Sequence, residues 1–388
     1  MEDIKNLSKT EQILRCSKIM IESQLKLLER NNASSQAFEK QAKINKSVEN
    51  FIANLGNIDN ISNQQYISYL MELCSLFKNA HISLKNKVEE EYQFLSQHLL
   101  YLHGEVFAVL NDNLLKVDKI GGKPAEDVCK EMSKYICYET DEWLGAQLNK
   151  MLNFKILYQI LGIDYSNIEL KNGQKQTNSP SKEFFDYYQY FPPYYKRTQS
   201  AYSYAFPCAN IVKINYRSCH EYSDGDFLNF TNVVKSEIEN RGINAYILDI
   251  RGNTGGNSEI IWPIINLFKD RNMTGCVLTD NRVFSSGTFA AYYAKKTLNA
   301  TLIGQPLAQE NERFGQGSGE IVLSDTLSIR ITEKYFKFSD VFKNSGAIKP
   351  DIVVPLTIEE LQNKKDKTLE TTIEYLQNLL QVQHQQEC

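Results

Sequence analysis

Apolar residues in the first quarter of the chain recur at the three- and four-residue spacing of an amphipathic helix. The segments with this spacing are TEQILRCSKIMIESQLKLLER (residues 10–30) and QQYISYLMELCSLF (64–77). The polar stretches RNNASSQ (30–36) and NIDNISNQ (57–64) separate them and are typical of loops. The pattern predicts a helical amino-terminal region over residues 1–95.

The hydrophobic pattern changes near residue 100. Residues 104–128, GEVFAVLNDNLLKVDKIGGKPAEDV, contain two short strand-like runs, a turn and a Gly-Gly-Lys-Pro break before a helix. A long helical stretch is expected from there to about residue 162. Residues 166–206 are rich in tyrosine and favour a loop-like segment, most clearly in FPPYYKRTQSAYSYAFP (191–207).

From residue 209 onward, apolar strand-like runs alternate with helical patterns. The strands are nearly continuous in hydrophobicity, which is typical of a largely parallel sheet with helices on both faces. Ligands of such sheets bind at the carboxyl ends of the strands. Two unusual loops follow predicted strands, the glycine-rich loop of AYILDIRGNTGGN (245–257) and the turn TDNRVFSSG (279–287). The expected strands are 209–216, 245–250, 276–280 and 301–304, and the expected helices are 227–242, 258–270 and 287–299.

Composition narrows the class of protein. The 388 residues are 42% hydrophobic and 23% charged, which is typical of globular proteins and enough for more than one core. The net charge of −4 gives no electrostatic footprint for nucleic acid. No long apolar run is present, so we expect no membrane span. The amino terminus lacks an apolar signal core, which predicts a cytoplasmic protein from the chain as given, or a secreted one if a signal peptide was removed.

The eight cysteines are scattered along the chain, and no two have the Cys-x-x-Cys spacing of a zinc site. We therefore expect no metal centre and no disulfide framework. Most of the cysteines are predicted to be small buried apolar residues in a reducing compartment.

Ser285 and Ser286 lie between a predicted strand and a predicted helix. A serine at this place is often a helix N-cap. It is also the place of a nucleophile, because a strand-to-helix turn exposes the hydroxyl above the sheet. In that interpretation the glycine-rich loop at 252–256 donates backbone N–H groups to a developing oxyanion. The glycines would then let an acyl carbonyl oxygen approach the backbone.

At these residues the sequence resembles the S41 peptidases, which include the carboxy-terminal processing proteases and the tricorn core protease. The family's Asp-x-Arg-x-Asn-x-Gly-Gly loop is matched at 249–256, and its nucleophile segment is similar to 283–287. Its next two motifs are similar to LIGQPLAQENERFG (302–315) and AIKPDIVVP (347–355). The resemblance implies a crotonase-like core with Ser285 as nucleophile. It also implies an oxyanion hole made by the backbone N–H groups of Gly255, Gly256 and Ser286.

A serine nucleophile needs a general base. One branch of the family uses a lysine beyond the third motif, but residues 304–317 contain no lysine. Lys295 and Lys296 lie in the helix after Ser285 and are expected to be solvated. Thr288 is a further departure, since the family often has an acidic residue three places after the nucleophile.

The other branch takes its base from a histidine in an upstream turn. The segment CSLFKNAHISLK (74–85) is similar to that turn and places His81 on the histidine. Asn79 and Ile82 replace the Asp and Thr of the family's pattern. We therefore predict His81 as the base, with His220 as the alternative because it follows a predicted core strand.

A carboxylate that orients the histidine would be the third catalytic residue. The sequence leaves its identity open. In tricorn-like relatives a glutamate precedes the closing motif, whereas KNSGAIKPD (343–351) has Asn344 or Ser345 there. Glu333 and Asp340 are nearby acids.

The segment LLKVDKIGGKPAEDV (114–128) is similar to part of the family's PDZ-like domain, although an ordinary hairpin before a helix explains it equally well. The predicted architecture is an α/β protein with a crotonase-type parallel-sheet core. Its parts are a helical region (1–95), a degenerate PDZ-like module with helices (96–165), a tyrosine-rich linker (166–206) and an S41 peptidase core with a carboxy-terminal helix (207–388).

We expect a serine endopeptidase that hydrolyses polypeptide substrates through an acyl-enzyme on Ser285, without a metal or cofactor. A non-catalytic ligand- or peptide-binding protein on the same scaffold is one alternative, favoured by Thr288 and the missing glutamate. A non-peptidase acyl hydrolase is the other.

Overall fold

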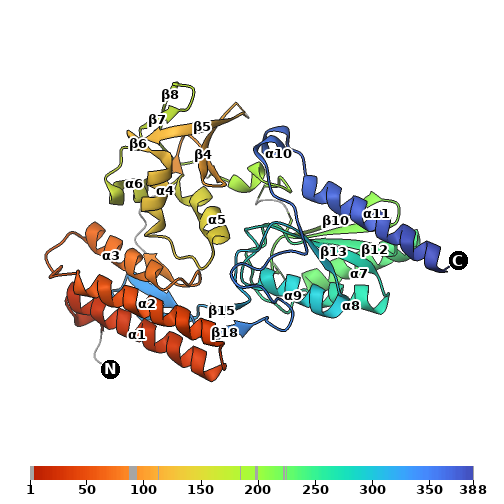
Figure 1. Cartoon of the computed structure of the whole chain (residues 1–388), viewed down its shortest axis with the longest axis horizontal. Helices are drawn as coiled ribbons and strands as arrows, with labels where there is room; N and C mark the ends of the chain where they lie inside the picture. The colour runs from red at the N-terminus through yellow and green to blue at the C-terminus, as the bar shows by residue number, and fades with distance from the viewer. Residues whose placement is uncertain are drawn as a thin grey trace. The chain divides into compact units, whose positions relative to one another are not determined.

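The computed structural model describes residues 4–86, 94–111, 113–183, 185–196, 200–221, 223 and 225–387. The chain divides into two compact units, and each is made of two chain segments. Unit 1 comprises Met1–Phe185 and Asn311–Ser339, and unit 2 comprises Asp186–Glu310 and Asp340–Cys388. Figure 1 shows the elements of both units along the chain.

Unit 1 begins with helices, as predicted, but they end at Leu76, and the last part of the predicted helical region 1–95 contributes strands β1 (Ser83–Asn86) and β2 (Phe94–Leu95). A short 3-10 helix, η1 (Ile4–Asn6), precedes α1 (Lys9–Arg30), α2 (Ser35–Ala53) and α3 (Asn63–Leu76). Each α-helix starts after a serine whose hydroxyl accepts a backbone N–H of the first turn, which satisfies a donor that would otherwise lack a partner. These N-cap residues are Ser8, Ser34 and Ser62. The helices pack around a core that includes Ile13, Met20, Leu70 and Phe77.

Residues 311–339 complete this helical part of unit 1, whereas the sequence had placed them in the 207–388 core. Strand β1 (Ser83–Asn86) pairs antiparallel with β17 (Leu327–Ile331), and β17 pairs with β16 (Gly319–Val322). Strands β15 (Glu312–Gly315) and β18 (Lys334–Lys337) form a separate ribbon. The physical reason is burial, because Ile321, Leu327 and Ile329 pack into the core of α1 and α3. Such long-range burial has no local signal in the sequence.

A second sheet in unit 1 has the strand order β3-β4-β5-β7-β8, and β6 pairs with β5. The predicted long helix is three shorter ones, and part of the predicted linker contributes strands β7 and β8. The PDZ-like assignment of this module stays a prediction. The strands are β3 (Leu99–Leu102), β4 (Glu105–Leu110), β5 (Asn113–Ile120), β6 (Lys123–Pro124), β7 (Asn167–Leu170) and β8 (Lys175–Thr177), with the pair β2 (Phe94–Leu95) and β9 (Pro180–Ser181) beside them; the helices are α4 (Ala125–Ser133), α5 (Asp141–Met151) and α6 (Lys155–Leu161).

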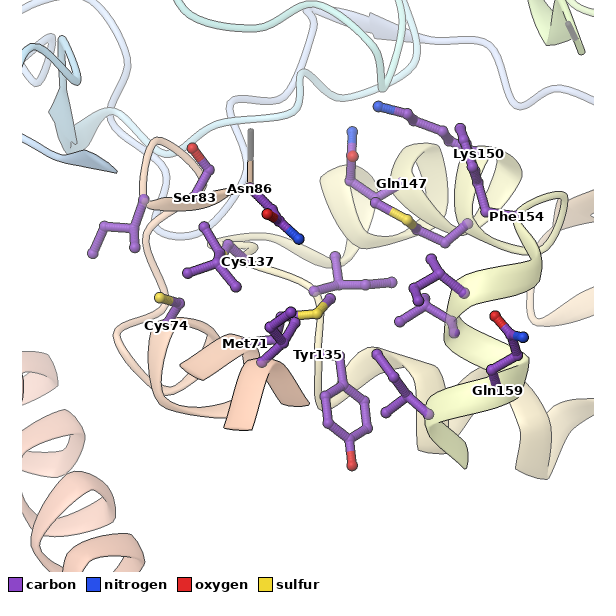
Figure 2. A pocket seen from close by; sticks show the side chains of 18 of the residues that line it. Met71, Cys74, Ser83, Asn86, Tyr135, Cys137, Gln147, Lys150, Phe154 and Gln159 are labelled. Atoms are coloured by element: carbon purple, nitrogen blue, oxygen red, sulfur yellow. The ribbon is translucent and has the colours of Figure 1, made fainter. Parts of the chain in front are cut away.

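Unit 1 also contains a pocket of about 890 Å³, shown in Figure 2. Side chains of α3, β1, α5 and α6 line it, together with the segment between α4 and α5. The lining is mixed, with apolar residues such as Met71 beside amides such as Gln147 and Gln159. This volume lies within the range of small-molecule sites.

Unit 2 is built on a six-stranded sheet, β10 (Tyr202–Cys208), β11 (Ile211–Tyr216), β12 (Ala245–Asp249), β13 (Thr274–Thr279), β14 (Thr301–Gly304) and β19 (Ile352–Val353). The edge strand β10 is antiparallel to β11, and the other pairs are parallel. The helices are α7 (Asp226–Arg241), α8 (Trp262–Asp270), α9 (Ser286–Leu298), α10 (Ile358–Asn363) and α11 (Lys367–Glu387), with η2 (Tyr187–Tyr190) preceding the sheet. The predicted alternation of parallel strands and helices is confirmed.

Helices cover both faces of this sheet (Figure 1). On one face, Ile247 and Leu278 pack with Leu376 and Leu380 of α11. On the other face the ring of Tyr246 stacks on Phe268 of α8 at a centroid distance of 4.0 Å. The middle strands are therefore buried on both sides, which explains their nearly continuous hydrophobicity. Across the described residues, no helix has the length and apolar character needed to cross a membrane.

Candidate active site

The parallel register brings the ends of β12 and β13 to one edge of the sheet, since Asp249 pairs with Leu278. The loop after β12 starts with a buried ion-pair network. The Arg251 guanidinium donates to both carboxylate oxygens of Asp249 and to both of Asp366 at 2.7–2.9 Å. Burial alone would raise the pKa of Asp249, but Arg251 and Lys213 hold it below its ordinary value. The first two motif residues thus anchor the loop.

Asn253 fixes the course of the loop. Its Nδ2 donates to the Tyr216 carbonyl at 2.9 Å, and its Oδ1 accepts the Gly255 N–H at 2.9 Å. Gly255 and Gly256 have φ of 104° and 137°, values that residues with a Cβ rarely adopt. A Cβ on Gly255 would lie 2.7 Å from Ser285 Cβ. The glycines therefore let two turns approach each other closely.

Ser285 lies in a strained turn between β13 and α9. Its φ is 53° and its ψ is −122°, and its side chain makes no capping hydrogen bond. Its N–H donates to the Gln309 Oε1 at 2.6 Å. The turn is held against the glycine loop, because the Phe284 N–H donates to the Asn253 carbonyl at 3.0 Å and the Ser286 hydroxyl to the Gly256 carbonyl at 2.6 Å. The structure brings Ser285, Ser286, Gly255 and Gly256 together.

The donors available for an oxyanion differ in part from those predicted. The Gly255 N–H already has an acceptor in its own loop, so we revise its expected part from donor to close-approach residue. Within the described part of the chain, no acceptor is recorded for the backbone N–H of Gly256 or of Ser286. Ser286 follows Ser285 directly, and Gly256 accepts the Ser286 hydroxyl through its carbonyl.

Of the two histidines considered as base, His220 belongs to unit 2. It follows Cys219, which forms an isolated parallel bridge with Gly256. A Cβ on Gly256 would lie 3.0 Å from His220 Cε1, so the imidazole is beside the glycine loop. The side chain is exposed.

His81 belongs to unit 1 and is half-buried in the turn before β1. Its backbone N–H donates to Asn79 Oδ1 at 3.1 Å, and its ring hydrogen-bonds the backbone of Phe314. Burial, with smaller contributions from Arg313 and Arg330, lowers the pKa of His81 from 6.5 to about 3. The imidazole is therefore neutral at neutral pH. Its pairing with Ser285 stays a prediction.

The candidates for a third catalytic residue occupy different surroundings. Glu333 is exposed and accepts a hydrogen bond from Ser318. Asp340 forms an ion pair with Lys296 at 2.8 Å. Asn344 donates to the carbonyls of its own loop, and Ser345 is exposed. None of these contacts selects one candidate.

The two lysines after Ser285 are held in ion pairs, Lys295 with Asp351 at 2.6 Å and Lys296 with Asp340. Lys296 is exposed, as expected from the sequence, whereas Lys295 is half-buried. Among the described residues, no three His, Cys, Asp or Glu side chains are grouped as a metal site would require. The arrangement is that of a serine beside backbone N–H groups, which a nucleophile with an oxyanion hole would require.

No protein-family model matches the chain, and no curated protein matches its sequence. Solved structures match its fold. Mature CPAF complexed with lactacystin aligns with a TM-score of 0.55 and 10% identity over 97% of this chain and 99% of that chain. Mature CPAF aligns with a TM-score of 0.53 and 10% identity over 96% of each chain. The tricorn protease aligns with a TM-score of 0.43 and 12% identity over 96% of this chain and 37% of that chain.

The structural neighbours of this chain include S41 family peptidases, among them a putative S41 protease from Bacteroides fragilis (TM-score 0.40, 10% identity, over 78% of this chain and 87% of that chain). The similarity is one of fold, because the sequence identities are low. The resemblance that the sequence predicted is confirmed at that level, as is a mixed α/β architecture.

Two contributing residues were missed by the sequence analysis. Gln309 accepts the N–H of Ser285, and Asp366 completes the ion-pair network of Arg251. Gln309 lies within the segment 302–315 that was matched to the family, but the match gave this residue no role. Asp366 precedes the carboxy-terminal helix, and no local pattern links it to Arg251.

Proposed function

We propose that this protein is a serine endopeptidase that cleaves polypeptides through an acyl-enzyme on Ser285. The observation that carries the proposal is the backbone of Ser285. The capping serines Ser8, Ser34 and Ser62 have ordinary extended backbones and accept a capping hydrogen bond, whereas Ser285 has φ 53° and makes none. Such a conformation costs about 1–3 kcal/mol and is concentrated at active sites. A helix cap does not require it.

The proposed reaction begins when Ser285 Oγ attacks the carbonyl carbon of the scissile peptide while its proton passes to a general base. The backbone N–H groups of Gly256 and Ser286 stabilise the oxyanion that forms. The base returns the proton to the leaving amine, and the C–N bond breaks. Water, activated by the same base, then hydrolyses the ester.

We propose His81 as the general base, on the resemblance of its turn to that of the histidine-dependent branch. The ring is neutral at neutral pH, as a base must be before it takes a proton, but its lowered pKa makes it a weak base, so the proposal rests on the resemblance. His220 is the second candidate, and its support is its position beside Gly256.

Labelling with a fluorophosphonate tests the nucleophile. We expect the wild type to be labelled and Ser285→Ala to lose all labelling with its circular dichroism unchanged. Ser286→Ala is the matched control and should keep most of the labelling, because Ser286 is proposed to act through its backbone. The opposite pattern would move the nucleophile by one residue.

The same preparation separates the alternatives. A non-catalytic binding protein stays unlabelled. A labelled protein that hydrolyses an ester but none of a set of unstructured polypeptides would be an acyl hydrolase, and the endopeptidase proposal would be rejected.

A further inference from the structure

Gln309 is buried, with no exposed surface, in the loop after β14. Its Oε1 accepts the N–H of Ser285 at 2.6 Å and the Thr288 hydroxyl at 3.2 Å. A backbone N–H is always a donor, so the amide oxygen and not the nitrogen must face Ser285. This one side-chain oxygen therefore holds the strained turn at two residues, the proposed nucleophile Ser285 and Thr288.

The backbone around Gln309 is fixed from both sides. The Ala308 N–H donates to the Val283 carbonyl at 3.1 Å, directly before the turn, and the Ile348 N–H donates to the Gln309 carbonyl at 2.9 Å. The next residue, Glu310, forms an isolated antiparallel bridge with Ala347. The side chain is thus presented from a rigid support, as precise positioning of a reacting group requires.

The contact has two consequences for the turn. First, it directs the Ser285 N–H toward Gln309, so the donors that remain for an oxyanion are on the neighbouring residues. Second, it stabilises a φ of 53° that a serine would otherwise leave. Without an acceptor, the half-buried N–H would favour a relaxed turn in which the Ser285 side chain moves from its position beside Gly255.

We propose that Gln309 is the positioning residue of the nucleophile, holding Ser285 in its attacking conformation through the backbone N–H. This inference rests on the proposed function of Ser285. The proposed effect of Gln309 acts through the backbone N–H of Ser285, so we expect its contribution in the rate and not in substrate affinity.

The test compares Gln309→Met, which keeps the length but removes the acceptor, with Gln309→Glu, which keeps an acceptor oxygen whether or not it is charged. The rate of fluorophosphonate labelling is measured against probe concentration, which separates the maximal acylation rate from probe affinity. We expect Gln309→Met to lower the maximal rate roughly ten- to hundredfold with affinity unchanged. Gln309→Glu should recover most of that rate.

The final labelled fraction separates positioning from folding. A variant that merely misfolds gives fewer labelled molecules at the normal rate, whereas a mispositioned nucleophile gives full labelling at a slow rate. Gln41→Met is the matched control, since Gln41 is 1% exposed and donates to Asn45 at 2.9 Å in unit 1. It should label at the wild-type rate. A wild-type rate in Gln309→Met, or an equally slow rate in Gln309→Glu, would overturn the proposal.

Hydrogen exchange of the Ser285 amide gives a readout that needs no activity. We expect this amide to exchange at least about tenfold faster in Gln309→Met than in the wild type, because its acceptor is gone. Unchanged exchange would overturn the inference even if Ser285 is never acylated. Accelerated exchange without labelling of the wild type would support the contact and reject the proposed function instead.

Discussion

The turn of Ser285 in unit 2 and the turn of His81 in unit 1 were predicted from the same resemblance, but they are built in different ways. Around Ser285, the backbone of two short loops makes the geometry, and glycines permit their close approach. Around His81, the surroundings are side chains such as Arg313 and Arg330 from β15 and β17, far along the chain. Backbone geometry leaves a local motif in the sequence, whereas a side-chain environment assembled from distant strands leaves none.

The largest expected effect concerns the general base. It decides whether the turn of His81 takes part in the mechanism. Loss of a general base typically lowers the rate about 10²–10⁴-fold. We expect His81→Gln to cause a loss of this size in peptide cleavage, measured as kcat/KM. His220→Gln should remain within about tenfold of the wild type, since the proposed mechanism has His220 accept no proton.

Lys295→Ala and Lys296→Ala are controls for this comparison, because both lysines already form ion pairs with aspartates. They should keep their activity. If His220→Gln is inactive and His81→Gln is not, the base is His220. Ser285 would keep its assigned role in that case.

The sequence predicted the fold well where patterns are local. The helices Lys9–Arg30 and Asn63–Leu76 and the alternating elements of unit 2 were predicted from periodicity, and the structure adds the caps Ser8 and Ser62 that start these two helices. The prediction from sequence failed where the chain leaves unit 1 and later returns to it. Residues 311–339 join unit 1 because β17 pairs with β1, a pairing that depends on burial of Ile329 and not on any nearby residue.

Within the candidate site, too, residues in local motifs were predicted and residues placed by long-range contacts were not. Ser285 and its glycines were predicted from contiguous motifs, and the structure brings these residues together. Gln309 was not, because its contact depends on a loop after β14 whose position is set by tertiary hydrogen bonds. Gly255 was predicted to donate its N–H to the oxyanion. The structure was needed to correct this, because only the contact with Asn253 shows where that N–H points.

Two buried arginines, one in each unit, extend the comparison of the two turns to protein stability. Arg251 is enclosed by the carboxylates of Asp249 and Asp366, so Arg251→Met leaves buried negative charge without its main partner. We expect a loss of about 3–5 kcal/mol in the free energy of unfolding. Burial lowers the pKa of Arg313 to about 10, so its charge is poorly solvated, and Arg313→Met should cost less than half as much. Urea unfolding of both variants measures the difference, and equal losses would contradict it.

The smallest expected effect tests the surroundings of His81 by pH. The folded pKa is about 3 and the ordinary value is 6.5, so between these values the unfolded chain binds a proton at His81 that the folded chain does not. Stability therefore falls as the pH is lowered through this window. His81→Gln lacks this proton, while every other group titrates as in the wild type. The stability of the wild type minus that of His81→Gln should then fall by about 1–2 kcal/mol between pH 7 and pH 5. Urea unfolding of both proteins at the two pH values measures this difference. A pH-independent difference would mean that His81 titrates alike in both states. The half-buried, arginine-flanked environment that separates this turn from that of Ser285 would then have no effect on His81 in solution.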